Sequence, residues 1–105
     1  MNIDEKAPLE SIKNKHLLAI DYGQKFTGLA TYYYGRDPFP LCYGRVEYKN
    51  DEKLLLNLKS IIEDEFIDIL VIGVPFFTDG KASTMTQTVI KFVELAKNQL
   101  EMPVY

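Results

Sequence analysis

A chain of 105 residues has room for one domain with one modest core, and its net charge of -3 argues against a broad basic face for nucleic acid. A local basic groove stays compatible with this charge, as does a site where metal ions bridge carboxylates to phosphates. The single cysteine, Cys42, excludes an internal disulfide and predicts a cytoplasmic location. We expect no signal peptide, because the first ten residues carry Asp4, Glu5 and Glu10 and no apolar h-region. We expect no membrane contact, because the apolar runs are far too short to span a bilayer.

Residues 1–15 mix charged side chains with Pro8 and hold few apolar ones, so we expect a loosely held N-terminal arm. One domain is expected over residues 16–105. It opens with segments rich in β-branched and aromatic residues, and the short links between them favour an antiparallel meander. The three predicted strands are Leu17–Asp21, Thr27–Tyr34 and Leu41–Tyr48.

The second half of the chain alternates helix and strand. Asn50 and Asp51 offer an N-cap to a helix whose leucines and isoleucines follow helical spacing. Ile67–Val74 is apolar on both faces, as in a central parallel strand. Thr84–Gln87 fits a capping box for a second helix, and Met102–Tyr105 begins another strand. Right-handed crossovers then predict an α/β mixed sheet of order about 3-2-1-4-5, with the elements β-β-β-α-β-α-β.

The residue that most needs an explanation is Asp21, a carboxylate at the end of an apolar strand. Such a carboxylate is costly to bury unless a charged or hydrogen-bonding group meets it. The predicted topology puts Asp21 at the carboxyl end of a central strand, the edge where the ligand sites of such sheets lie. The plain interpretations of Asp21 are a strand-end cap or a salt bridge to Lys25.

Two segments resemble the motifs of a known family. Ala19–Lys25 with Gly28–Ala30 is similar to the first motif of the YqgF/RuvX-type proteins, which are bacterial Holliday-junction-resolvase-like proteins and pre-16S ribosomal RNA nucleases. Ile69–Pro75, followed by Asp79-Gly80, is similar to their second motif. The resemblance covers about residues 16 to 105. It implies a ribonuclease H-like fold and hydrolysis of phosphodiester bonds in structured RNA or DNA, in pre-16S rRNA processing during ribosome biogenesis or in Holliday junction resolution.

The resemblance also implies a site. Asp21 matches the family's first-strand acid and would help hold Mg²⁺ or Mn²⁺, which activates water. These hard cations prefer several converging oxygen ligands. Lys25 matches a family lysine that would contact a phosphate, with Gly23 allowing close approach, and Thr78 and Lys81 border a second loop that could touch nucleic acid. The plainer interpretations are backbone geometry for Gly23 and a solvated surface lysine for Lys25.

The sequence departs from the family pattern in one respect. In the family the next strand leads into an Asp-Glu-Arg motif and a final helix carries another acid, whereas this sequence stops at Tyr105. We therefore expect an incomplete ribonuclease H-like domain without the usual final helix, in which Asp21 is the only family acid. The alternative function is a catalytically silent domain of the same fold that binds nucleic acid or protein. An actin-like ATPase shares the Asp-x-Gly turn but needs two such lobes. An uncovered sheet face would associate with a second copy, as a homo-oligomer, or with the N-terminal arm.

The remaining chemistry-bearing residues have structural interpretations. Asp68 is expected to start a strand, and Asp79 to begin a turn. His16 has no metal-ligating neighbour in the sequence, so we treat it as structural or exposed. Cys42 is expected to be buried in its strand. Strand propensity accounts for the tyrosines at 32–34 without a ligand, although one of them could stack on a base.

Overall fold

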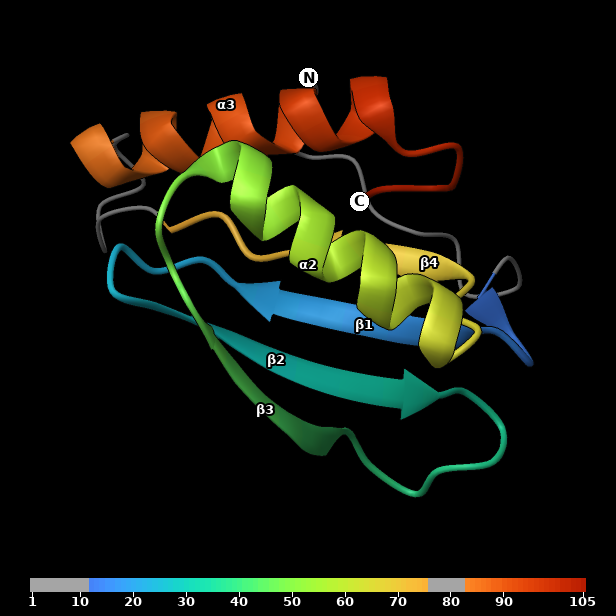
Figure 1. Ribbon diagram of the computed structural model, residues 1–105. Helices are drawn as coiled ribbons and strands as arrows, with labels where there is room; N and C mark the ends of the chain where they lie inside the picture. The colour runs from blue at the N-terminus through green and yellow to red at the C-terminus, as the bar shows by residue number, and fades with distance from the viewer. Residues whose placement is uncertain (1–11, 76–82) are drawn as a thin grey trace.

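The computed structural model describes residues 12–75 and 83–105. Strands and helices follow one another as the sequence predicts, up to the last strand (Figure 1). The elements are β1 (His16–Asp21), β2 (Phe26–Tyr33), β3 (Leu41–Glu47), α2 (Asp51–Asp64), β4 (Ile69–Ile72) and α3 (Thr84–Gln99). No helix in the described ranges is long and apolar enough to span a membrane.

The sheet has the predicted order. Its strands run β3-β2-β1-β4, antiparallel between β3, β2 and β1 and parallel between β1 and β4. The predicted last strand is reduced to one parallel bridge between Leu70 and Val104, flanked by hydrogen bonds from Leu70 N–H to the Pro103 carbonyl and from Tyr105 N–H to the Leu70 carbonyl. These bonds place residues 103–105 beside β4, in the fifth position of the mixed sheet. The result is the ribonuclease H-like arrangement that the sequence implied.

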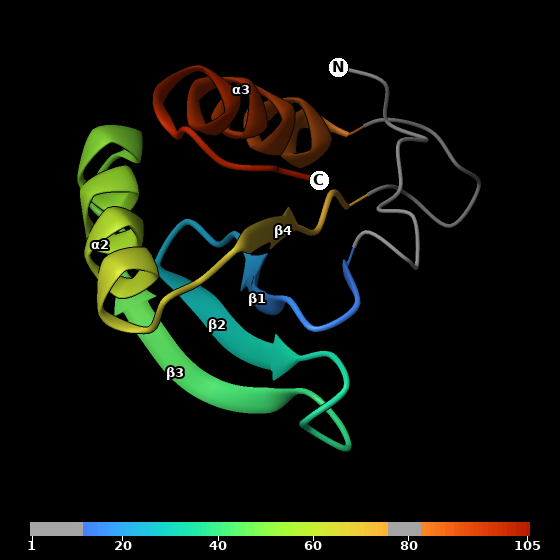
Figure 2. The same cartoon turned by 90° about the vertical axis from the view of Figure 1, so that its right-hand side faces the viewer.

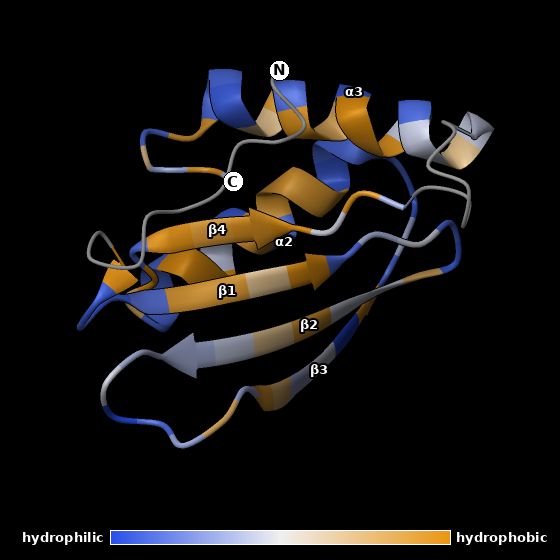
Figure 3. Ribbon diagram, turned by 180° about the vertical axis from the view of Figure 1, so that it is seen from behind, coloured by the Kyte–Doolittle hydropathy of each residue, from blue (hydrophilic) through white to orange (hydrophobic). Residues whose placement is uncertain are grey.

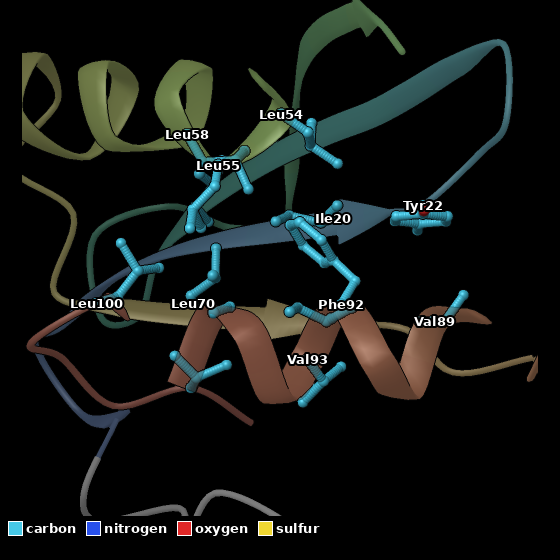
Figure 4. Close-up of a cluster of buried hydrophobic side chains, with 14 of the residues drawn as sticks. Ile20, Tyr22, Leu54, Leu55, Leu58, Leu70, Val89, Phe92, Val93 and Leu100 are labelled. Carbon is cyan, nitrogen blue, oxygen red and sulfur yellow. The ribbon is translucent and has the colours of Figure 1, made fainter. Parts of the chain in front are cut away.

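Both helices cover the same face of the sheet, and this placement decides where the core lies (Figure 2). Because side chains alternate along a strand, every second residue of β1 and β4 points toward the helices. Figure 4 shows these side chains meeting the apolar stripes of α2 and α3. The main contributors are Leu18, Ile20, Leu29, Leu70, Ile72, Leu54, Leu55, Leu58, Val89, Phe92, Val93 and Ala96. The apolar positions that the sequence places on the two helix faces are therefore core positions.

The opposite face, which carries Ala19, Asp21, Gly28, Ala30 and Val71, is called the open face below. In the described part of the chain no helix lies over it, as the view from behind shows (Figure 3). The side chains of β1 on this face are exposed at positions 19 and 21. The prediction of a sheet face without a covering helix thus holds for the described residues, although Ile69, which alternates with Leu70 and so points to this face, is only 3% exposed. The prediction that the N-terminal arm packs on this face concerns residues 1–11, which lie outside the described residues.

Two local predictions were wrong. Cys42 is exposed rather than buried, because it pairs with Ala30 across β2 and β3 and so belongs to the open face. The capping box of α3 begins at Ser83 and not at Thr84: Ser83 Oγ accepts from Thr86 N–H at 3.0 Å, and Ser83 N–H donates to Thr86 Oγ1 at 2.9 Å. A serine one residue earlier offers the same hydroxyl, so sequence alone did not separate the two positions. Asn50 caps α2 as predicted, through Lys53 N–H.

The end of α2 carries an unusual residue. Phe66 has φ 53° and is 84% exposed, while the next residue, Ile67, donates its N–H to the Ile62 carbonyl at 3.0 Å. This bond is the 6→1 bond of a Schellman motif, and glycine is the usual residue at the position that Phe66 occupies. The backbone of Phe66 therefore adopts a left-handed conformation, and the aromatic side chain gains no burial that would offset its cost.

Candidate active site

Asp21 is the last residue of β1, and its side chain lies exposed on the open face. Its partner across β2 is Gly28, which has no side chain, and a Cβ added at Gly28 would lie 3.6 Å from the Asp21 Cβ. On the other side, Gly73 follows β4 and donates its N–H to the Ile20 carbonyl at 3.1 Å. The Asp21 carboxylate is thus flanked by two residues without side chains, Gly28 on β2 and Gly73 after β4.

These residues border an open hollow of about 420 Å³. Its floor is made of small and apolar side chains, and among the described residues that line it Asp21 is the one ionisable group. The lining residues are Ala19, Ile20, Asp21, Gly28, Leu29, Ala30, Val71 and Gly73. Small residues on the floor keep the carboxylate accessible, so the hollow has room for an ion and for part of a substrate beside Asp21.

The carboxylate of Asp21 has neither a hydrogen-bond donor nor an ion-pair partner within residues 12–75 and 83–105. Lys49 forms an ion pair with Glu47 at 2.8 Å, away from Asp21. Of the two plain interpretations of Asp21, the salt bridge to Lys25 is therefore wrong for this structure, while Asp21 does end its strand. A strand-end carboxylate without an internal partner is available to an external one.

Gly23 and Lys25 lie in the link that follows β1. A Cβ at Gly23 would come within 2.1 Å of the Phe26 carbonyl oxygen, so only glycine fits this turn. The Lys25 side chain is exposed, and its carbonyl accepts from Tyr48 N–H at 2.8 Å. The turn thus holds Lys25 next to the Asp21 edge with its ammonium group in solvent. The two other predicted nucleic-acid contacts, Thr78 and Lys81, lie outside the described residues, as does Asp79.

An exposed carboxylate is the kind of oxygen ligand that Mg²⁺ and Mn²⁺ prefer, so Asp21 fits as one ligand of such an ion. Across the described ranges, no three His, Cys, Asp or Glu side chains are close enough to hold a metal ion. Asp21 therefore supplies part of a metal site and not a whole one.

A polar cluster behind Asp21 was missed by the sequence reasoning. The hydroxyls of Tyr22 and Tyr48 both donate to Asp51 Oδ1, at 2.7 and 2.8 Å, and the two hydroxyl oxygens lie 3.1 Å apart. Burial, together with the hydrogen bonds to Tyr48 and Asp51, raises the pKa of Tyr22 well above its usual value. The cluster ties the end of β1 to the end of β3 and to the first turn of α2. It fixes the backbone that carries Asp21.

The far end of β1 is held by a separate set of polar contacts. His16 N–H donates to Asp68 Oδ2 at 2.9 Å, the His16 Nδ1 lies 2.9 Å from the Glu65 carbonyl oxygen, and the imidazole stacks on Tyr33. His16 and Asp68 therefore act in strand pairing, as the structural interpretation predicted. Neither lies at the Asp21 end of the sheet.

The open face carries two more exposed side chains near Asp21 that no sequence pattern indicated. Arg45 is the Cα partner of Gly28, and Phe26 lies two residues before Gly28 on the same strand. The register brings both to the face of Asp21. Only the pairing of β2 with β3 makes this neighbourhood visible, because nineteen positions of sequence separate the two residues.

A mixed β3-β2-β1-β4 sheet with both helices on one face and an exposed carboxylate ending its central strand defines a ribonuclease H-like protein. Residues 15–105 match the model of the RuvX family, described as Holliday junction resolvase, and the chain belongs to that family. The fold is similar to the RuvC structure from Thermus thermophilus, with a TM-score of 0.57 and 15% identity over 86% of this chain and 61% of that one.

Curated relatives agree with the family. A protein of Chlorobium phaeobacteroides (strain BS1), named as a candidate pre-16S rRNA nuclease, is 35% identical over 76% of this chain and 53% of its own length. One from Rickettsia felis, of the same name, is 34% identical over 99% of this chain and 66% of its own. The chain thus spans between about half and two thirds of these relatives. A Bacteroides thetaiotaomicron protein with an actin-like ATPase fold shares the fold at a TM-score of 0.53 and 12% identity, over 89% of this chain and 33% of that one.

Proposed function

We propose that the protein takes part in metal-dependent hydrolysis of phosphodiester bonds in structured nucleic acid, either in pre-16S rRNA processing or in Holliday junction resolution. Asp21 is its catalytic acid and one ligand of Mg²⁺ or Mn²⁺. The observation that carries the proposal is the Asp21 carboxylate, exposed at the carboxyl edge of a central strand and without a partner in the described residues. Membership of the RuvX family and the names of the relatives support it. The cytoplasmic location stays a prediction.

The residues around Asp21 have separate tasks in this proposal. A bound divalent ion supplies an activated water and neutralises charge that develops on the phosphate. Asp21 would hold such an ion through its carboxylate. The missing side chains at Gly28 and Gly73 leave room for a phosphate beside it. Lys25 contacts a neighbouring phosphate and sets the register of the strand, while Gly23 keeps the turn that presents Lys25. The further ligands come from outside the described residues.

A cleavage assay tests this role for Asp21. Wild type and Asp21→Asn are compared on a structured precursor-rRNA fragment and on a four-way DNA junction, with Mg²⁺, with Mn²⁺ and with EDTA. Asp64→Asn is the matched control, because Asp64 is an exposed carboxylate at the end of α2. We expect cleavage by wild type and by the control in the presence of metal, and a loss of at least about a hundredfold for Asp21→Asn. Equal cleavage by wild type and Asp21→Asn would remove Asp21 from the mechanism.

A catalytically silent domain that binds nucleic acid or protein is the second candidate. It is favoured by the lack, in the described ranges, of any group of three metal-ligating side chains. This candidate predicts that wild type binds a structured RNA or DNA without cleaving it, with or without divalent ions. Binding measured beside cleavage in the same samples separates the two functions.

Association of two copies over the open face is a related proposal. The floor of the hollow is apolar, and a second copy seated there would cover it. Such a dimer would also cover Asp21. Sedimentation velocity over a range of protein concentrations, with and without nucleic acid, tests whether dimer and nucleic acid compete for this face.

A further inference from the structure

The starting observation is a row of residues that crosses the open face at the carboxyl edge of the sheet. Asp21 of β1 pairs with Gly28 of β2, and Gly28 pairs with Arg45 of β3. Neighbouring strands lie about 4.8 Å apart, so the Cα atoms of Asp21 and Arg45 are about 10 Å from each other. Phe26 is two residues from Gly28 and faces the same way. Arg45 and Phe26 thus lie close enough to Asp21, the candidate metal ligand, for neighbouring parts of one nucleic-acid strand to contact all three.

Arg45 and Phe26 contact each other directly. The Arg45 Cζ lies 4.0 Å from the centroid of the Phe26 ring, which is the geometry of a cation–π contact. Phe26 is 44% exposed, and Arg45 is exposed as well. In the described part of the chain Arg45 forms no ion pair. The nearest acid along β3, Glu47, is already paired with Lys49 at 2.8 Å. The guanidinium charge is therefore free to meet an anion.

Core packing does not explain this pair. The hydrophobic core lies on the other face of the sheet, and Phe26 is absent from it. The ring keeps nearly half of its surface in water, and it contacts an arginine on an edge strand. Proteins that bind single-stranded nucleic acids combine a flat aromatic surface, on which a base stacks, with a nearby cation that contacts the phosphate.

We infer that Phe26 and Arg45 form a nucleotide-binding platform beside Asp21: the ring stacks on an unpaired base, and the guanidinium contacts the adjoining phosphate. This inference rests on the proposed function, because it takes nucleic acid as the substrate. The platform holds an unpaired nucleotide next to the scissile phosphate. It recognises the face of a base, so its binding is tolerant of sequence and requires a single-stranded or flipped nucleotide.

The chain offers matched controls for both members of the pair. Arg36 stacks on Tyr33 with its Cζ 4.7 Å from the ring centroid, near the opposite end of the sheet. Tyr43 is an exposed aromatic residue on β3 whose hydroxyl donates to Glu65, at the C-terminal end of α2. Arg36→Gln and Tyr43→Leu remove a charge or a ring of similar exposure without touching the platform.

The test is the binding of a short fluorescein-labelled single-stranded RNA, followed by fluorescence anisotropy in EDTA. A second probe of equal length carries abasic nucleotides. We expect Phe26→Leu to weaken binding of the RNA about tenfold and to leave the abasic probe unchanged, while Phe26→Tyr binds as wild type. Arg45→Gln weakens both probes and lowers the slope of log affinity against log salt by about one. The two control variants bind both probes as wild type, and melting curves confirm the fold of each variant.

Three results would overturn the platform. One is wild-type affinity of Phe26→Leu and Arg45→Gln for the RNA. Another is an equal loss on the abasic probe for Phe26→Leu, which would make the ring structural. The third is a wild type that binds neither probe. Because the assay contains no divalent ion and measures no cleavage, it is independent of Asp21. The platform can thus fail while Asp21→Asn still abolishes cleavage, and it can stand if Asp21→Asn cleaves normally.

Discussion

The Tyr22 hydroxyl is expected to stabilise the site scaffold in a pH-dependent way, and Tyr22→Phe tests this. Tyr22 is 6% exposed, and its hydroxyl donates to Asp51 Oδ1 at 2.7 Å. A hydrogen bond to a charged acceptor contributes about 1.5–3 kcal/mol. Because Tyr48 still donates to the same oxygen at 2.8 Å, we expect the lower end, a loss of about 1.5 kcal/mol at pH 7.

High pH should remove this difference. Burial and the hydrogen bonds to Tyr48 and Asp51 raise the pKa of Tyr22 in the folded state, whereas the unfolded chain has the ordinary tyrosine pKa of about 10. A raised folded pKa means that the contribution is fully present below pH 10 and declines as the pH rises further. At pH 11 ionisation of Tyr22 in the unfolded chain lowers the free energy of unfolding of wild type by about 1.4 kcal/mol. The Tyr22→Phe variant has no hydroxyl at this position and does not lose this amount. The two proteins should then be almost equally stable.

Urea unfolding followed by circular dichroism, at pH 7 and pH 11, measures both quantities. Tyr43→Phe is the control, because its hydroxyl is exposed and lies 3.4 Å from Glu65 Oε1, so the stability should barely change at either pH. A difference between wild type and Tyr22→Phe that is the same at both pH values would refute the shielding of Tyr22 from ionisation. No difference at pH 7 would refute the contribution of the hydrogen bond.

The other predictions concern single backbone positions. Phe66→Gly should stabilise the protein by about 0.5–1 kcal/mol in thermal unfolding, because glycine adopts the left-handed conformation freely and the 84% exposed ring gives up no burial; a lower melting temperature would contradict this. Gly23→Ala should destabilise by about 2 kcal/mol or more, since its Cβ would lie 2.1 Å from a backbone oxygen. Gly28→Ala should keep the stability, with its Cβ at an ordinary 3.6 Å from Asp21, and reduce the cleavage rate by narrowing the hollow. Equal losses of stability for Gly23→Ala and Gly28→Ala would contradict the claim that only Gly23 lacks room for a Cβ.

The sequence predicted those features of the fold that depend on residues close together in the chain. Helical spacing and Asn50 located α2, and apolar runs located β1 and β4, because these signals lie within a few residues of each other. The handedness of crossovers extended these elements to the sheet order. Two motifs then sufficed to indicate the family. The choice between Ser83 and Thr84 as the cap of α3 needed coordinates, because both offer a hydroxyl.

Asp21 shows where the division lies. Its position at the carboxyl edge of a central strand followed from the sequence alone, since strand order and alternation are set by local patterns and chain handedness. That it has no salt bridge, that Gly28 and Gly73 flank it, and that Phe26 and Arg45 share its face were decided by tertiary structure. Strand register and the choice of the helix-covered face bring together residues far apart in the chain, and no local pattern encodes those distances. The same pairing left Cys42 exposed and joined Tyr22 to Asp51.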